Sequence, residues 1–108
     1  MNIANIRESS GDFHLLETTG RTQTATMTLK PGEATGDEPE AHPHSDQTVV
    51  MLEGELVAEV GSEREVLRSG QSLIIPAGVK HRFRNEASDT AFAFTVYAPP
   101  AYQTDDPT

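Results

Sequence analysis

The sequence contains no cysteine, which excludes disulfide bonds and thiolate metal sites. This absence fits a reducing compartment, and we expect a cytoplasmic protein. The first residues, MNIANIRESSG, contain neither the basic segment nor the apolar segment of a signal peptide. No stretch approaches the roughly 18 apolar residues that a membrane span requires, so we expect no membrane partner.

Basic side chains are scarce, with 8 lysines and arginines against 17 aspartates and glutamates, for a formal net charge of −9. A surface of this charge repels phosphate backbones, so nucleic acid is not an expected partner. The length of 108 residues fits one domain with a core of its own.

Helical periodicity is also missing over any long segment. Apolar and polar residues instead alternate, as in TQTATMTL at 22–29, or form short apolar runs between clusters of turn residues. This pattern predicts an all-β sandwich or barrel. The segments expected to form strands are 22–29, 48–52, 56–60, 73–75, 81–85 and 91–97.

One cluster of polar side chains precedes the apolar run at 48–52. It reads EAHPHSDQ and places two histidines, a glutamate, an aspartate and a glutamine in residues 40–47. Such a cluster is either a solvated acidic loop or half of a metal site whose remaining ligand lies further along the chain.

A candidate for that remaining ligand, His81, lies in the segment GQSLIIPAGVKHRFRN, which covers 70–85. Proline ends a strand because it cannot donate to the ladder, and glycine permits the turn that follows. The segment resembles the second conserved motif of the cupin superfamily, which is Gly, five residues, Pro-x-Gly, two residues, His, three residues and Asn. Every fixed position matches, at Gly70, Pro76, Gly78, His81 and Asn85.

The cluster at 40–47 resembles the first cupin motif, which ends in His-x-His, three or four residues, Glu, six residues and Gly. Gly54 takes the terminal position, and Gln47 then replaces the usual glutamate. Counting back further places His42 at the second histidine position and Glu40 at the first. We favour this register because it keeps the following strand in phase.

A second register of the first motif begins at Gly36. It places His42 and His44 at the two histidine positions but leaves only two residues before Gln47. Residues two apart on a strand point to one face, so either pair can face the barrel interior. In this register the ligand set is neutral, whereas the set with Glu40 carries one negative charge.

The resemblance, which covers about residues 24–97, implies a cupin-type double-stranded β-helix, or jelly-roll, barrel with a metal inside. Imidazole and oxygen donors suit one divalent transition metal, from Fe, Mn, Ni, Co, Cu and Zn. Four protein ligands would leave positions open for a ligand. The expected metal ligands are Glu40, His42, Gln47 and His81, with His44 as the alternative to Glu40.

The function implied is binding of a small, partly apolar organic molecule. A metal-dependent enzyme would be a dioxygenase, an isomerase or epimerase, or a decarboxylase, and the alternative is a non-catalytic ligand-binding or sensor protein. Tyr97 is the one obvious hydroxyl that could act as an acid or hydrogen-bond donor at the barrel mouth. The residues expected to point inward are Met27, Leu29, Met51, Leu56, Phe83, Phe92, Phe94 and Tyr97.

Three segments are expected along the chain: an N-terminal arm over 1–20, the barrel over 21–100 and a polar tail over 101–108. The arm contains more apolar residues than a free arm should expose. We therefore expect a homodimer that buries them, with the arm as a strand that can be exchanged between the two copies.

Overall fold

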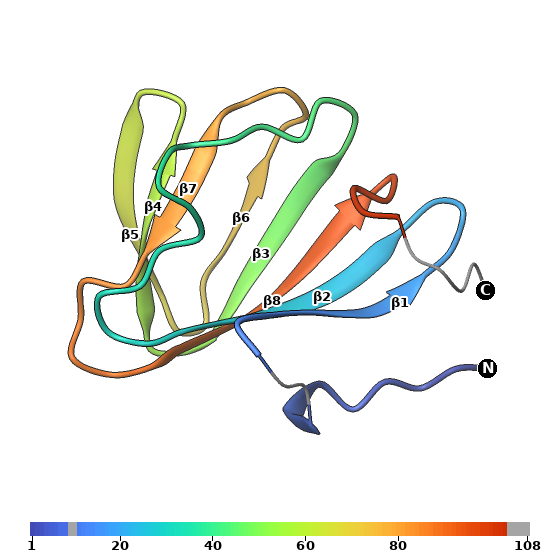
Figure 1. The fold of residues 1–108 in the computed structure, drawn as a ribbon, viewed down its shortest axis with the longest axis horizontal. Helices are drawn as coiled ribbons and strands as arrows, with labels where there is room; N and C mark the ends of the chain where they lie inside the picture. The colour runs from blue at the N-terminus through green and yellow to red at the C-terminus, as the bar shows by residue number, and fades with distance from the viewer. Residues whose placement is uncertain (9–10, 104–108) are drawn as a thin grey trace.

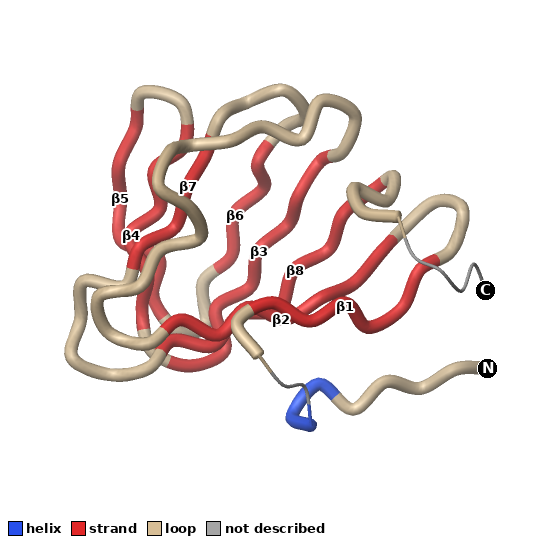
Figure 2. The backbone as a smooth tube through the Cα atoms, in the orientation of Figure 1, coloured by secondary structure: helices blue, strands red, loops and turns tan. Residues whose placement is uncertain are grey.

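Eight strands and one short 3-10 helix form the part of the chain that the computed structural model describes, residues 1–8 and 11–103. The helix η1 (Ile6–Glu8) lies near the N-terminus (Figures 1 and 2), and its Arg7 pairs with Glu53 at 2.9 Å and lies over the ring of Phe92. The strands are β1 (Phe13–Thr18), β2 (Gln23–Leu29), β3 (Asp46–Glu53), β4 (Glu55–Val60), β5 (Glu63–Arg68), β6 (Ser72–Ile75), β7 (His81–Arg84) and β8 (Ala91–Ala98).

The strands form two antiparallel sheets, one in the order β1-β2-β8-β3-β6 and one in the order β5-β4-β7. The smaller sheet is extended by the segment 32–42, which runs along β7 (Figure 1). In this extension the amide of Thr35 donates to the carbonyl of Phe83, and the backbones of Glu40 and His81 exchange two hydrogen bonds. The prediction of an all-β jelly-roll barrel is confirmed.

The predicted strands occur with small shifts at their ends, but β5 was not predicted. Its sequence, EREVLR, is mostly charged and therefore lacks the apolar alternation by which the other strands were predicted. β5 is the edge strand of the smaller sheet, where charged and exposed side chains are common. The N-terminal arm contains β1, which pairs with β2 of the same chain. Exchange of this arm between two copies stays a prediction.

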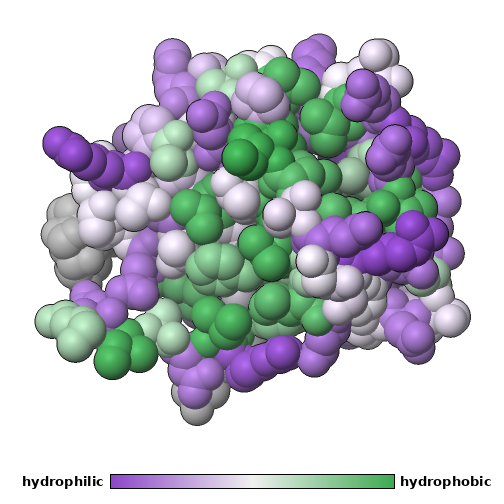
Figure 3. Space-filling model, turned by 180° about the vertical axis from the view of Figure 1, so that it is seen from behind, coloured by the Kyte–Doolittle hydropathy of each residue, from purple (hydrophilic) through white to green (hydrophobic). Residues whose placement is uncertain are grey.

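The central strands of the larger sheet are amphipathic. Along β8 buried and half-buried positions alternate, so that Thr95 and Tyr97 face the interior together with two alanines. Phe92 and Phe94 therefore face outward, and the expectation that they point inward is wrong, because residues of opposite parity cannot share a face. Figure 3 shows a broad hydrophobic area on the side of the molecule seen from behind Figure 1.

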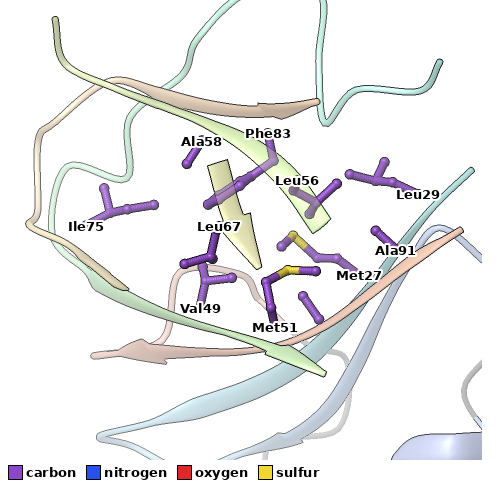
Figure 4. Packing of buried hydrophobic residues seen from close by; sticks show 11 residues of the cluster. Met27, Leu29, Val49, Met51, Leu56, Ala58, Leu67, Ile75, Phe83 and Ala91 are labelled. Atoms are coloured by element: carbon purple, nitrogen blue, oxygen red, sulfur yellow. The ribbon is translucent and has the colours of Figure 1, made fainter. Parts of the chain in front are cut away.

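The hydrophobic core lies between the two sheets. Figure 4 shows side chains from both sheets pointing toward one another, with Phe83 from the smaller sheet above Met27 and Met51 from the larger one. The members of the core cluster are Met27, Leu29, Val49, Met51, Leu56, Ala58, Leu67, Ile75, Phe83, Ala91 and Ala93.

Two of the motif residues are explained by local structure. Gly54 has a φ of +75°, and a Cβ there would lie 2.9 Å from the carbonyl oxygen of Thr90, so a side chain does not fit. Asn85 is buried and donates from Nδ2 to the carbonyls of Leu29 and Asp89, both at 2.8 Å. These contacts join the end of β7 to β2 and to the loop before β8.

The chain beyond β8 folds back against the barrel. Gln23, which is fully buried, accepts hydrogen bonds at Oε1 from the amides of Ala101 and Tyr102, and its Nε2 donates to the Tyr102 carbonyl. The expected polar tail, 101–108, is therefore attached to β2 at its start, and residues 104–108 lie outside the described residues. No helix in the described part of the chain is long and apolar enough to cross a membrane.

Candidate metal centre

A cavity of about 270 Å³ opens at one end of the barrel. Its deep wall consists of side chains from β2, β3, β7 and β8, and its rim comes from the start of β1, the segment 34–42 and the residues after β8. The residues that line it are Asp12, Phe13, Met27, Leu29, Ala34, Thr35, Glu38, Glu40, His42, Gln47, His81, Phe83, Tyr97 and Tyr102.

His81 opens β7 and is 9% exposed. Its Nδ1 lies 3.0 Å from the carbonyl oxygen of Val79, and since a carbonyl only accepts, this nitrogen carries the proton. In the neutral ring Nε2 then has a free lone pair. A backbone bond of this kind is the usual way in which a metal-binding histidine is oriented.

His42 lies beside His81, with their ring centroids 5.2 Å apart. Its carbonyl accepts a hydrogen bond from the amide of Gly78, so the turn of the second motif holds the first motif in place. The amide of Ala77 likewise donates to Asp46 Oδ1. Burial lowers the pKa of His42, and His81 lowers it further, against a smaller opposite effect of Glu40. This ring is therefore neutral near pH 7 and can offer a lone pair.

Gln47 is 2% exposed and lies on β3. Its Nε2 donates to Thr95 Oγ1 at 3.0 Å and to the Tyr97 hydroxyl at 3.3 Å. Its Oε1 is buried and has no hydrogen-bond partner among the described residues. A buried polar atom without a hydrogen-bond partner destabilises the folded protein by about 1–3 kcal/mol. A ligand that binds this oxygen would remove that penalty.

The two alternatives for the fourth ligand differ in position. Glu40 is directly opposite His81 in the backbone ladder, so both side chains leave the same face, and Glu40 lines the cavity. His44 is exposed and is not among the residues that line the cavity. The structure thus brings Glu40, His42, Gln47 and His81 to one cavity and leaves His44 outside it.

The donors do not form a conventional cluster. Within residues 1–8 and 11–103 there is no group of three histidine, cysteine, aspartate or glutamate side chains that could hold a metal ion. The two imidazoles and the free amide oxygen of Gln47 are the three inward donors, and Glu40 stands at the rim with an exposed side chain. A metal centre here would depend on an amide oxygen.

Tyr97 is 1% exposed, and its ring lies 5.1 Å from that of His42. Burial raises its pKa, with a smaller contribution from the neighbouring Tyr102 hydroxyl, so Tyr97 remains a neutral phenol. It can donate a hydrogen bond inside the cavity but cannot serve as an ionised base near pH 7.

Thr95, Phe13 and Tyr102 are among the residues of the site that were not predicted from the sequence. Thr95 could have been found, because it shares the inward face of β8 with Tyr97. Phe13 and Tyr102 come from segments that were assigned to the arm and the tail, yet their rings lie 5.0 Å apart at the cavity. No spacing rule connects the two ends of the chain, so nothing local in the sequence could have placed them there.

Comparison with known proteins identifies the fold and the family. The Cupin_2 family model, described as Cupin domain, matches residues 25–97. The crystal structure of TT1209 from Thermus thermophilus superposes with a TM-score of 0.81 and 30% identity over 92% of this chain and 98% of that chain. A cupin with a double-stranded β-helix from Methanocaldococcus jannaschii, described as RmlC-like, has a TM-score of 0.80 at 20% identity, over 92% of this chain and 91% of that one.

Curated relatives share part of their length with the chain. Polyketide synthase CurC from Streptomyces cyaneus is 36% identical over 63 residues, which are 58% of this chain and 40% of CurC. The chain spans 40% to 64% of the lengths of four curated relatives that it matches. The family match itself extends from β2 to β8 and contains both halves of the candidate site. The chain therefore belongs to the cupin domain family.

Proposed function

We propose that the chain is a metal-binding cupin that holds a small, partly apolar organic molecule in its barrel. One observation carries this proposal: the buried Oε1 of Gln47 has no partner among the described residues and lines the same cavity as two adjacent imidazoles. A divalent cation would satisfy that oxygen together with the lone pairs of His42 and His81.

The donor set fits a borderline transition metal better than Ca²⁺ or Mg²⁺, because two of the three inward donors are imidazoles. His42, Gln47 and His81 would hold the ion, with Glu40 as the fourth ligand. Fe, Mn, Ni, Co, Cu and Zn all accept such donors. When bound, the metal would supply Lewis acidity toward an oxygen atom of the organic molecule.

The chain's own residues would position that molecule. Met27, Leu29 and Phe83 line one side of the cavity and exclude water from its apolar part. The Tyr97 hydroxyl, kept neutral by burial, would donate a hydrogen bond to a ligand oxygen. An arrangement of this kind supports either dioxygenation of an enol or isomerisation next to a carbonyl. The relationship to a polyketide synthase protein favours an enolisable ketone as the substrate.

A ligand-binding or sensor cupin without catalysis is the second candidate. It is favoured by the absence, in the described part of the chain, of three acidic, histidine or cysteine ligands in one group. An amide in place of a carboxylate is a weaker metal donor, which fits a cavity that binds its ligand without transforming it.

Metal content is the decisive measurement. Protein purified without a metal-binding tag should carry one equivalent of metal by mass spectrometry, and His81→Ala or His42→Ala should lose it. His44→Ala is the matched control and should keep its metal, because its side chain lies outside the cavity. Added Mn, Ni or Zn should also raise the melting temperature of metal-free protein by linkage.

Protein that contains no metal, and that melts at the same temperature with and without added ions, would contradict the metal centre. Oxygen uptake with a panel of enols and 1,3-diketones then separates the two candidates. Turnover that is lost with the metal identifies an enzyme, and binding without turnover identifies a ligand-binding protein.

A further inference from the structure

Tyr102 closes part of the cavity mouth. Its ring contacts two segments of the rim, with centroid distances of 5.6 Å to the ring of His42 and 5.0 Å to that of Phe13. A third contact, at 5.3 Å, joins it to the buried ring of Tyr97. Tyr102 lines the cavity and is 39% exposed, so its ring borders both the interior and the solvent. Removal of this ring would open the rim between His42 and Phe13.

The backbone of Tyr102 is held by a side chain from inside the protein. Gln23 is fully buried on β2, and its Oε1 accepts from the amides of Ala101 at 3.1 Å and Tyr102 at 3.0 Å. Its Nε2 donates to the Tyr102 carbonyl at 2.9 Å and to Thr18 Oγ1 at 3.0 Å. Movement of the segment would leave a buried amide unsatisfied, which disfavours it. Gln23 is therefore a positioning residue that keeps Tyr102 at the mouth.

The entrance is built from parts of the chain that the family match does not include. That match covers residues 25–97, whereas Phe13 lies before it and Tyr102 after it. The three inward donors of the candidate metal centre all lie within the match. The shared segment thus supplies the donors, and the two end segments supply rings at the entrance. Rings at the entrance meet a bound molecule at the end that points away from the donors.

We propose that Tyr102 is a specificity-determining residue, which limits how far a bound molecule can extend from the donors toward the mouth. The cavity then accepts a molecule with a small group at that end and disfavours one with a bulky group. The inference rests on the proposed function for the end of the molecule that faces the donors. The hydroxyl is not required, because the contacts with His42 and Phe13 are ring contacts.

Three cyclic 1,3-diketones of increasing size test this limit: cyclohexane-1,3-dione, its 5,5-dimethyl derivative and its 5-phenyl derivative. They share one enolisable head and differ only at the carbon opposite to it. Their dissociation constants would be measured by ligand-observed NMR, with added zinc and again after removal of metal by a chelator. We expect the unmodified chain to bind the phenyl derivative more weakly than the two smaller probes.

Variants of Tyr102 and of its anchor assign the limit to the ring. Relative to cyclohexane-1,3-dione, Tyr102→Ala should bind the phenyl derivative on the order of tenfold more tightly than the unmodified chain does, because the missing ring leaves room for the larger group. Tyr102→Phe is the matched control, since it keeps the ring and should keep the preference. Gln23→Leu retains Tyr102 but removes its anchor, so it should shift the preference in the same direction by a smaller factor.

Access to the cavity gives a second readout that needs no ligand. The neutral nitroxide TEMPOL increases the relaxation of protons that it can approach, and NMR would measure its effect on ring protons of metal-free protein. Tyr97, which is 1% exposed, and His81, which is 9% exposed, should respond weakly in the unmodified chain and more strongly in Tyr102→Ala. His44, exposed and outside the cavity, should respond equally in both proteins and is the internal control.

An unchanged preference between the largest and smallest probes in Tyr102→Ala would overturn the inference, and so would binding of no probe by either protein. Equal relaxation of the Tyr97 ring in the two proteins would also overturn it. The metal analysis reports separately on the proposed function. A protein that holds metal but keeps its preference in Tyr102→Ala refutes only the size limit, and a metal-free protein whose preference shifts refutes only the metal centre.

Discussion

At the scale of single residues, Gln47 is the clearest departure from the cupin pattern. Two hydroxyls, from Thr95 and Tyr97, accept hydrogen bonds from its amide nitrogen and so fix its oxygen in the cavity. A glutamate at this position would have no proton to donate to them. The neighbouring residues of β8 thus suit an amide, and the glutamine has its own set of partners.

Gln47→Glu tests this balance between folding and metal binding. Without metal the variant should be less stable by about 1–3 kcal/mol, because a buried carboxylate would replace a hydrogen-bonded amide. With metal it should bind on the order of tenfold more tightly, since carboxylate is the stronger donor. Differential scanning fluorimetry with and without Mn²⁺ would measure both effects.

Gln103→Glu is the control for this change, because it adds the same charge at an exposed position. Equal responses of the two variants to Mn²⁺ would show that Gln47 does not contact the ion.

At the scale of elements, the alternation of apolar and polar residues predicted where the strands lie better than it predicted which face of each strand is buried. The period-2 pattern located β2, β4 and β8 correctly, but it did not decide which parity of β8 is buried, because both of its faces are rich in apolar residues. The inward face has small residues and Tyr97, and the outward face has two phenylalanines. A prediction from side-chain size and hydrophobicity alone therefore assigned the face with the two phenylalanines to the interior, although that face points outward.

The two cupin motifs predicted which segments of the central barrel approach the site. His42 and His81 lie side by side as expected, because the motif spacing reflects the turn at 76–78 and its hydrogen bond to His42. The contributions of Phe13 and Tyr102 could not be predicted. They depend on how β1 and the residues after β8 fold back, which is decided by long-range contacts such as those of Gln23.

The segment after β8 depends on Gln23 for its position. Gln23→Leu keeps the approximate volume of the side chain but removes the hydrogen bonds to the amides of Ala101 and Tyr102. We expect these two amides to exchange hydrogen for deuterium faster, while amides in the middle of β2 and β8 keep their protection. Hydrogen exchange monitored by NMR would measure this difference.

Gln71→Leu, at an exposed position on a turn, is the control and should leave those amides protected. Unchanged protection of Ala101 and Tyr102 in Gln23→Leu would mean that ring packing alone holds the segment.

At the scale of the whole molecule, the acidic charge is unevenly distributed. The outer face of the larger sheet has half-buried or exposed apolar side chains, and Ile74 is 65% exposed. Glu53, which is opposite Phe92 in the ladder, is paired with Arg7 at 2.9 Å, and this pairing offsets its charge where two copies of net charge −9 would meet through this face. The residues on this face are Thr28, Thr48, Val50, Leu52, Ile74, Phe92, Phe94 and Val96.

We therefore expect a homodimer in solution, formed through this face by a second copy of the chain. Ile74→Glu should shift the protein toward monomer, because it places a like charge opposite itself across a two-fold interface. Analytical ultracentrifugation would measure the change. Ser62→Glu adds the same charge in the turn between β4 and β5 and should leave the dimer intact. A monomer mass for the unmodified chain would contradict the expectation.

The positions of the tyrosines give the cavity a built-in spectroscopic reporter. The chain has no tryptophan and two tyrosines, and both Tyr97 and Tyr102 line the cavity. The ultraviolet emission of the whole protein therefore originates from one small volume. A quenching ion or a conjugated guest that enters the barrel should dim nearly all of it, so occupancy can be titrated without any label.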